Sequence, residues 1–312
     1  GLDVMGVDTG REKRMAGGNS RVIALNATNG VKVWDFHPEY PVWNLMPLFP
    51  GDGSTVFMDF TGGVYKLSLD SGSLLWHTPA PQSNGSFTDG GVILGPNGNA
   101  YSCSNPGSFK GAEGTKGALR AFSLEDGQML WEQVLPHPCN SWPVVGRVSK
   151  STELSVVVTP GSFMGAQTMH GGVMAFDAAT GEPQWQYQAP VYRAPFNMAK
   201  GDAEGFADRS KFDPSHGICL PAHWSAPTIA GDGKVYIGRS DGFLYTVRGP
   251  SNLDGAIAFA RTNLDSDIDF KTTEGVKVET FDGDGASLHG AMAIAPHMAA
   301  FSTCDTLYVF RF

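Results

Sequence analysis

The sequence is short of positive charge. Lysine and arginine contribute 22 residues against 31 aspartates and glutamates, and the formal net charge is −9. One short basic run, Arg-Glu-Lys-Arg at 11–14, interrupts this pattern. Because contact with a phosphate backbone needs a dense cationic surface, the composition argues against a nucleic acid as the main partner.

Long hydrophobic runs are also missing. No segment approaches the ~18 consecutive apolar residues that a transmembrane helix requires, so we expect a chain that does not span a membrane. The sequence begins with glycine and shows no signal peptide. We therefore expect a processed or trimmed chain.

Cysteine is scarce, with four residues that are neither adjacent nor spaced as C-x-x-C. This spacing excludes a vicinal disulfide and a haem-attachment motif. Four cysteines still permit two disulfides in three pairings, and equally permit four reduced, buried thiols. They are Cys103, Cys139, Cys219 and Cys304.

Turn-forming residues are abundant, with 40 glycines and 20 prolines. Hydrophobic residues make up 41% of the chain and charged residues 17%, which is typical of a folded protein with a large core. Many short elements joined by tight turns are expected from this composition. Such an organisation fits an all-β architecture better than one of long helices.

One turn motif occurs four times. Each copy has a glycine, three further residues and a tryptophan, and the tryptophans are 42, 55 and 54 residues apart in turn. A period of this size, with several strands in each unit, indicates a β-propeller. The copies are ALNATNGVKVW (24–34), KLSLDSGSLLW (66–76), AFSLEDGQMLW (121–131) and AFDAATGEPQW (175–185).

Two more units follow without the tryptophan, at 223–247 and 288–312. The sequence therefore predicts an all-β propeller of about six four-stranded blades in a single domain, 1–312. The first unit shows no segment that predicts an innermost strand. Seven blades, some of them incomplete, remain the alternative.

This repeat resembles the tryptophan-docking repeat of the PQQ-like β-propellers. That family includes quinoprotein alcohol dehydrogenases and the scaffolding lipoprotein of the bacterial outer-membrane assembly machine. The resemblance implies that the glycine adopts a turn conformation closed to other residues. It also implies that each tryptophan packs against the neighbouring blade, which indicates a structural role rather than a catalytic one.

The enzymes of this family bind pyrroloquinoline quinone (PQQ) with a calcium or lanthanide ion on the propeller axis. This chain lacks their adjacent cysteine pair, and no residue of it matches their catalytic acid or metal ligands. We therefore interpret it as a non-catalytic binding or scaffold propeller. The alternative is a quinone-dependent oxidoreductase that acts on an alcohol or sugar with PQQ and calcium.

Segments that lead into the innermost strands should converge at one mouth of the central channel. Aromatic and polar residues are frequent there, and they predict a pocket for a flat or carbohydrate-like ligand or for a loop of a protein partner. The other interpretation is that these side chains fill the channel as core. The candidates are Trp43, Asn44, Asn140, Trp142, His223, Trp224 and His289.

The longest segment between strands, 188–221, contains a further candidate, Arg193, and could cap the same mouth.

The sequence contains two weak metal-binding patterns. His216, Cys219 and His223 have ligand-like spacing but no fourth ligand. The alternating acidic residues Asp265, Asp267 and Asp269 are better explained as an exposed loop than as a calcium site.

The resemblance also implies a location outside the cytosol, in the periplasm, on secretion or in an organelle lumen.

Overall fold

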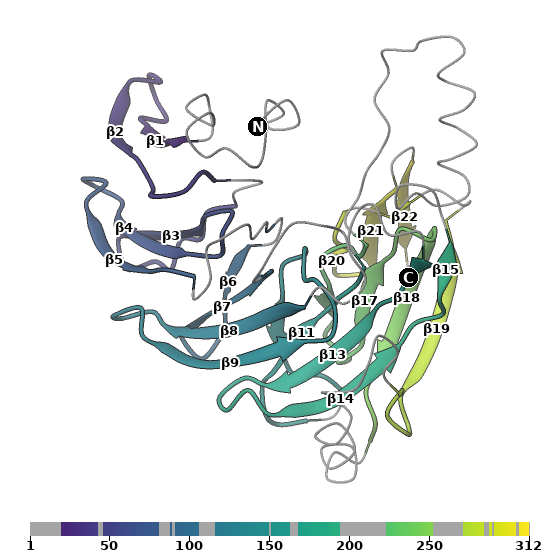
Figure 1. Cartoon of the computed structure of the whole chain (residues 1–312). Helices are drawn as coiled ribbons and strands as arrows, with labels where there is room; N and C mark the ends of the chain where they lie inside the picture. The colour runs from purple at the N-terminus through teal and green to yellow at the C-terminus, as the bar shows by residue number, and fades with distance from the viewer. Residues whose placement is uncertain are drawn as a thin grey trace.

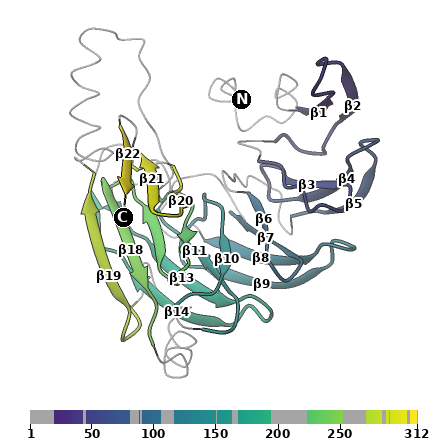
Figure 2. The ribbon, with the colours of Figure 1, turned by 180° about the vertical axis from the view of Figure 1, so that it is seen from behind.

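The computed structural model is built from β-strands arranged around an open arc (Figure 1). It describes residues 20–42, 46–80, 88, 91–105, 116–149, 151–162, 168–193, 223–251, 271–283, 287–288, 290–303 and 306–311. The view from behind shows the same order of sheets, from β1 and β2 at one end of the arc to β20–β22 at the other (Figure 2). The described part of the chain contains no helix with the length and apolar character of a membrane span.

Six sheets follow one another as blades, numbered 1 to 6 here, and every strand pairing is antiparallel. Blades 3, 4 and 5 have four described strands, blades 2 and 6 have three, and blade 1 has two. Blades 1 to 3 consist of β1 (Val22–Leu25) and β2 (Lys32–Phe36); β3 (Ser54–Met58), β4 (Val64–Ser68) and β5 (Leu74–Thr78); and β6 (Val92–Leu94), β7 (Asn99–Ser104), β8 (Gly117–Ser123) and β9 (Met129–Leu135).

The second half of the chain repeats this meander and adds one small sheet, in which β12 pairs with β15. Blades 4 to 6 consist of β10 (Val144–Gly146), β11 (Ser155–Val158), β13 (Gly172–Asp177) and β14 (Pro183–Gln188); β16 (Thr228–Ile229), β17 (Val235–Gly238), β18 (Phe243–Arg248) and β19 (Lys277–Asp282); and β20 (Ala293–Ala295), β21 (Met298–Ser302) and β22 (Leu307–Arg311). The small sheet is β12 (Thr168–Met169) with β15 (Tyr192–Arg193).

The core lies between the facing surfaces of neighbouring blades. Tyr101 and Leu119 of blade 3 pack with Val156 and Phe176 of blade 4, and all four are fully buried. Valine, phenylalanine and tyrosine suit these positions because their side chains fill the space between two pleated sheets. Every residue of β3 and β11 is buried, which explains why these strands contain the continuous apolar runs 56–58 and 156–158 rather than an alternating pattern.

The repeated glycine closes the turn between the third and fourth strands of a blade. Gly72, Gly127 and Gly181 have φ angles of +70°, +75° and +74°, in the left-handed region that other residues avoid. The tryptophan of the preceding repeat lies directly on each turn, so that a Cβ atom would come within 2.6 Å of its ring. The indole N–H groups of Trp34, Trp76 and Trp131 donate to the carbonyl oxygens of Leu69, Leu124 and Ala178 at 2.6, 3.1 and 3.3 Å.

The fourth tryptophan makes a different contact, because the turn of blade 5 is interrupted. Residues 249–276 separate β18 from β19, and Trp185 packs against Gly249 at the start of this insertion. Glu279 of β19 pairs with Thr246 at the position where Trp185 of β14 pairs with Ala175. The missing tryptophan of the fifth unit is therefore replaced by a glutamate on the outermost strand.

Two glycine substitutions separate backbone strain from steric clash. Gly30→Ala places an L-residue at φ +72° with no atom near its Cβ, so we expect a loss of stability of about 1–2 kcal/mol. Gly181→Ala has the same strain at φ +74° and also presses on the ring of Trp131, which adds about 1–3 kcal/mol. Urea unfolding of the two variants measures the difference, and equal losses would contradict the proposed packing.

Candidate functional site

The predicted site lies at the end of the blades opposite the glycine turns. In an antiparallel meander, the turn from the second to the third strand and the segment leading into the next blade share one end of the sheet. Hydrogen bonds confirm this arrangement, because Asn105 contacts Asn140 and Arg239 contacts His223 across these two kinds of loop. We call this end the mouth face.

The structure describes five of the eight predicted ligand-binding residues. Asn140, His223 and Trp224 are buried, Trp142 is half-buried and Arg193 is exposed at the end of β15. Trp43, Asn44 and His289 lie outside the described residues, as do the weak metal candidates Asp265, Asp267 and Asp269, and also His216 and Cys219. Whether the described five bind a ligand stays a prediction.

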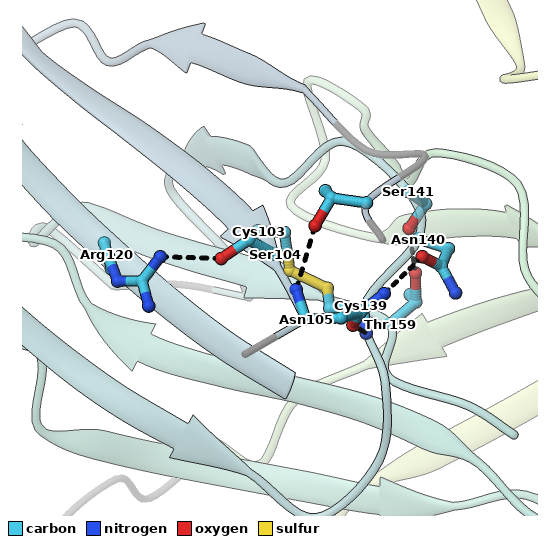
Figure 3. The surroundings of a disulfide bond; sticks show 9 residues. Cys103, Ser104, Asn105, Arg120, Cys139, Asn140, Ser141 and Thr159 are labelled. Carbon is cyan, nitrogen blue, oxygen red and sulfur yellow. Dashed lines mark hydrogen bonds between the residues drawn. A yellow bond between two sulfur atoms is a disulfide. The ribbon is translucent and has the colours of Figure 1, made fainter. Parts of the chain in front are cut away.

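A disulfide joins blade 3 to the segment that leads into blade 4. Cys103, in β7, is bonded to Cys139, with a Cα–Cα distance of 5.6 Å and no exposure of either residue (Figure 3). This bond decides between thiol and disulfide for one pair, a choice that the sequence left open. Cys219 and Cys304 lie outside the described residues.

Two asparagines extend this link. Asn105 Nδ2 donates to Asn140 Oδ1 at 2.5 Å, and the backbone N–H of Cys139 donates to Asn105 Oδ1 at 2.7 Å (Figure 3). Both asparagines are buried, at 5% and 8% exposure. Next to them, the hydroxyls of Ser141 and Thr159 hydrogen-bond at 2.8 Å. The side chain of Asn140 is thus fixed by internal bonds.

Loss of the disulfide is expected to destabilise the protein by about 2–5 kcal/mol, because the bond restricts the unfolded chain over a separation of 36 residues. Thermal unfolding with and without dithiothreitol measures this effect. The double variant Cys103→Ala, Cys139→Ala is the control, since its midpoint should start low and respond less to the reductant. A wild-type midpoint that reduction leaves unchanged would contradict the expectation.

A second cluster on the mouth face surrounds a fully buried arginine. Arg239 follows β17, and its guanidinium lies 4.8 Å from the ring centroids of both Tyr192 and Trp224. Its Nη1 donates to Asp241 Oδ2 at 2.9 Å and to the carbonyl of Pro190 at 2.8 Å. Such stacking and ion pairing compensate for the removal of a charge from water.

His223 is held on both sides in this cluster. Arg239 Nε donates to His223 Nε2 at 2.9 Å, so the proton of the neutral ring belongs on Nδ1, which faces the carbonyl of Ser162 at 3.3 Å. Burial lowers the pKa of His223 well below 6.5, and the nearby charge of Arg239 lowers it further. The imidazole is therefore neutral at pH 7, with both nitrogens engaged.

This low pKa predicts a loss of stability in mild acid. Below pH 6.5 the unfolded chain binds a proton at His223 that the folded protein does not, so stability falls with pH by up to about 1.4 kcal/mol per unit. His223→Gln should show a shallower decrease between about pH 6.5 and 5. Urea unfolding at several pH values tests this, and parallel profiles for variant and wild type would contradict it.

Several buried donors on this face have no acceptor among the residues that the structure describes. They are Arg239 Nη2, Trp224 Nε1 and Trp142 Nε1. A buried donor without a partner is costly, so each is suited to a carbonyl, a carboxylate or a water molecule. The ring of Trp142 also lies directly over Gly91, where any side chain would collide with it.

The comparisons with known proteins agree with this architecture. The family model of the outer membrane protein assembly factor BamB matches residues 18–203. The chain belongs to the BamB family. No curated protein matches it.

Solved structures resemble this BamB family member in fold. Quinohemoprotein alcohol dehydrogenase from Comamonas testosteroni is 13% identical over 91% of this chain, with a TM-score of 0.52, and the chain spans only 49% of it. The computationally designed protein Ika8 is 12% identical, covers 95% of this chain and 69% of its own length, and has a TM-score of 0.50. BamB from Moraxella catarrhalis is 12% identical, with 94% and 77% coverage and a TM-score of 0.42. The predicted all-β propeller fold is confirmed.

The cofactor that the dehydrogenases suggest does not fit the described residues. They contain no group of three histidine, cysteine, aspartate or glutamate side chains placed to hold a metal ion. Tyr192 and Trp224 lie against Arg239, so the buried cluster is already packed by its own aromatic rings. We derive no reaction step through PQQ or calcium.

Sequence reasoning missed Arg239 and Asn105, which organise the two clusters. Both follow the second strand of a blade, whereas the predicted set was drawn from segments that lead into the first strand. The turn Arg239–Phe243 repeats the hydrogen bonds of the turn Asp59–Gly63 in blade 2. Comparison of these equivalent turns would have revealed an arginine where blade 2 has an aspartate.

Proposed function

We propose that this BamB-family propeller is a non-catalytic binding protein that presents its mouth face to a protein partner. The observation that carries the proposal is that the candidate polar groups already form hydrogen bonds to other groups of the protein. Both nitrogens of His223 and the side-chain oxygen of Asn140 contact other protein atoms. A general base or acid must instead reach a substrate directly or through one water molecule.

The rigid support of this face favours recognition of another protein. The Cys103–Cys139 bond and the Asn105–Asn140 pair hold the segment that carries Trp142. A preformed surface loses little conformational freedom on binding. The family name describes an assembly factor, and assembly of other proteins requires contact with them.

The side chains best placed for contact are the half-buried Trp142, the exposed Arg193 and the neighbouring Val191, which is 46% exposed. Tryptophan and arginine dominate the energetics of many protein interfaces. Within the proposal, these three residues form the contact surface, whereas the buried Asn140, His223 and Trp224 support it.

The Cys103–Cys139 disulfide supports a location outside the cytosol, because such bonds persist in oxidising compartments. Family membership supports the same location. Trapping of free thiols in intact source cells, followed by mass spectrometry, tests this inference. Cys103 and Cys139 recovered as alkylated thiols would contradict it.

Site-specific photocrosslinking tests the partner proposal. A photoreactive residue at position 142 should yield a defined protein adduct, and Arg193→Glu should reduce its yield. A photoreactive residue at the exposed Asn29, in the glycine turn at the opposite end of blade 1, is the control. Identical adducts from both positions, or none from position 142, would overturn the proposal.

Titration with PQQ and calcium tests the oxidoreductase alternative. Because the described residues provide no fitting donor set, we expect no saturable, stoichiometric binding by calorimetry. Tight binding together with dehydrogenase activity towards an alcohol or sugar would replace the binding-protein proposal by the enzymatic one.

A further inference from the structure

The outer edge of blade 4 is covered by another part of the same chain. The backbone N–H of Thr273 donates to the carbonyl of Gln186 at 2.9 Å, and the N–H of Gln186 donates to Thr273 Oγ1 at 3.0 Å. The N–H of Gln188 likewise donates to Thr272 Oγ1 at 3.0 Å. The segment runs opposite to β14, so it is antiparallel to that strand.

This covering changes the exposure of the outermost strand. Pro183, Gln184, Trp185 and Gln186 of β14 are all buried. In β9, the equivalent strand of blade 3, exposed residues predominate. The difference shows that a further extended segment can pair with the outermost strand of a four-stranded blade in this protein.

The register of β9 identifies its outward backbone groups. Trp131 pairs with Ala121 as Trp185 pairs with Ala175, so Glu132 corresponds to Gln186 and Val134 to Gln188. The N–H and C=O of Glu132 and the N–H of Val134 therefore point away from β8. No described residue outside the blade donates to or accepts from these groups.

Other outermost strands carry features that discourage pairing. In blade 2, Pro79 stands where β9 has Val134 and supplies no N–H. In blade 1, Asp35 forms ion pairs with Arg21 and Lys32 along the edge. In blade 5, β19 exposes the charged residues Lys277, Glu279 and Asp282.

β9 has apolar side chains in place of such features. Met129, Leu130 and Val134 are 41%, 44% and 53% exposed. The one charged residue of the strand, Glu132, is paired with Arg120, whose Nε lies 2.5 Å from its Oε2. β22 of blade 6 also exposes apolar residues, and it is the third and last described strand of its sheet, whereas β9 is the fourth strand of a complete blade.

We propose that β9 is a docking edge to which an extended segment of a protein partner adds an antiparallel strand. The segment would bond to the backbone of Glu132 and Val134 as residues 271–273 bond to β14, and its apolar side chains would cover Met129, Leu130 and Val134. Main-chain pairing of this kind supplies affinity and side-chain contacts supply specificity. Figure 1 places β9 on the outside of the arc.

Charge indicates the chemistry of that segment. The turn before β9 exposes Glu125 and Asp126, and the chain as a whole carries a net charge of −9. A strand that alternates apolar residues with lysine or arginine complements this edge. The inference shares with the proposed function the premise of a protein partner, but it concerns a different surface.

The test uses a fluorescein-labelled ten-residue peptide of alternating valine and lysine and measures fluorescence anisotropy. Val134→Pro removes an outward N–H and replaces the side chain, and Pro79 occupies the equivalent position just after β5 of blade 2. We expect wild type to bind and Val134→Pro to bind about tenfold more weakly or not at all. Val134→Thr, which keeps the N–H, is the matched control and should bind within about threefold of wild type.

A second peptide, N-methylated at alternate backbone positions, cannot pair with a strand and should not bind. Equal binding of the two peptides, or of wild type and a folded Val134→Pro variant, would overturn the inference. So would a wild-type dimer in sedimentation that Val134→Pro dissociates, because the occupant would then be a second copy. Crosslinking from position 142 is independent of these outcomes, so the two proposals can fail separately.

Discussion

Replacing Trp185 with alanine is expected to lower the free energy of unfolding by about 3–5 kcal/mol. Its side chain is 1% exposed and packs between the sheets of blades 4 and 5, together with Val157 and Val247. The contact with Gly249 also joins blade 4 to the insertion that covers it. Alanine would leave a cavity at this junction, since neighbouring strands cannot close in without breaking their register.

Two further variants test that explanation by urea unfolding. Trp185→Phe keeps an aromatic ring and should cost clearly less, because Nε1 of Trp185 has no acceptor in the described part of the chain. Trp131→Ala should also cost less, since Trp131 is only half-buried. A Trp185→Ala loss no larger than that of Trp131→Ala would contradict the assigned packing.

Replacing Arg239 with methionine is expected to cost about 3–5 kcal/mol, comparable to the loss of one partner from a buried ion pair. Asp241 would keep its charge while losing the guanidinium at 2.9 Å, and His223 Nε2 would lose its donor. Methionine fills a similar volume between Tyr192 and Trp224, so the loss reports on charge more than on packing.

The double variant Arg239→Met, Asp241→Asn is the control for this expectation. Removal of both charges should restore part of the lost stability, because no uncompensated carboxylate remains. Tyr245, whose hydroxyl donates to Asp241 Oδ2 at 2.6 Å, can still donate to the asparagine oxygen. Losses that simply add in the double variant would show that the two side chains are not coupled.

The sequence predicted the repeating part of the fold because its signals are local. A glycine in a left-handed turn and a tryptophan four residues later lie within one hairpin, and recurrence at propeller spacing identified the blades. Gly72, Gly127 and Gly181 have the expected positive φ angles. The strand count was less regular than predicted, with four described strands in blades 3, 4 and 5 alone.

The candidate site could be predicted only in part. The described parts of the two segments that lead into β10 and β16 lie on one face, since strand alternation fixes where they lie. The turns after the second strands reach the same face, and their contributions, Asn105 and Arg239, were missed. Burial of Asn140, His223 and Trp224 depends on how neighbouring loops pack, which no spacing in the sequence reveals.

By itself, then, the sequence determined the propeller architecture and the family, because both follow from short motifs repeated along the chain. The tertiary structure alone decided that Cys103 bonds to Cys139, that Arg239 stacks with Tyr192 and Trp224, and that β14 is covered while β9 has no described covering. The physical reason is distance along the chain. These contacts join residues that only the packing of separate blades and loops brings together.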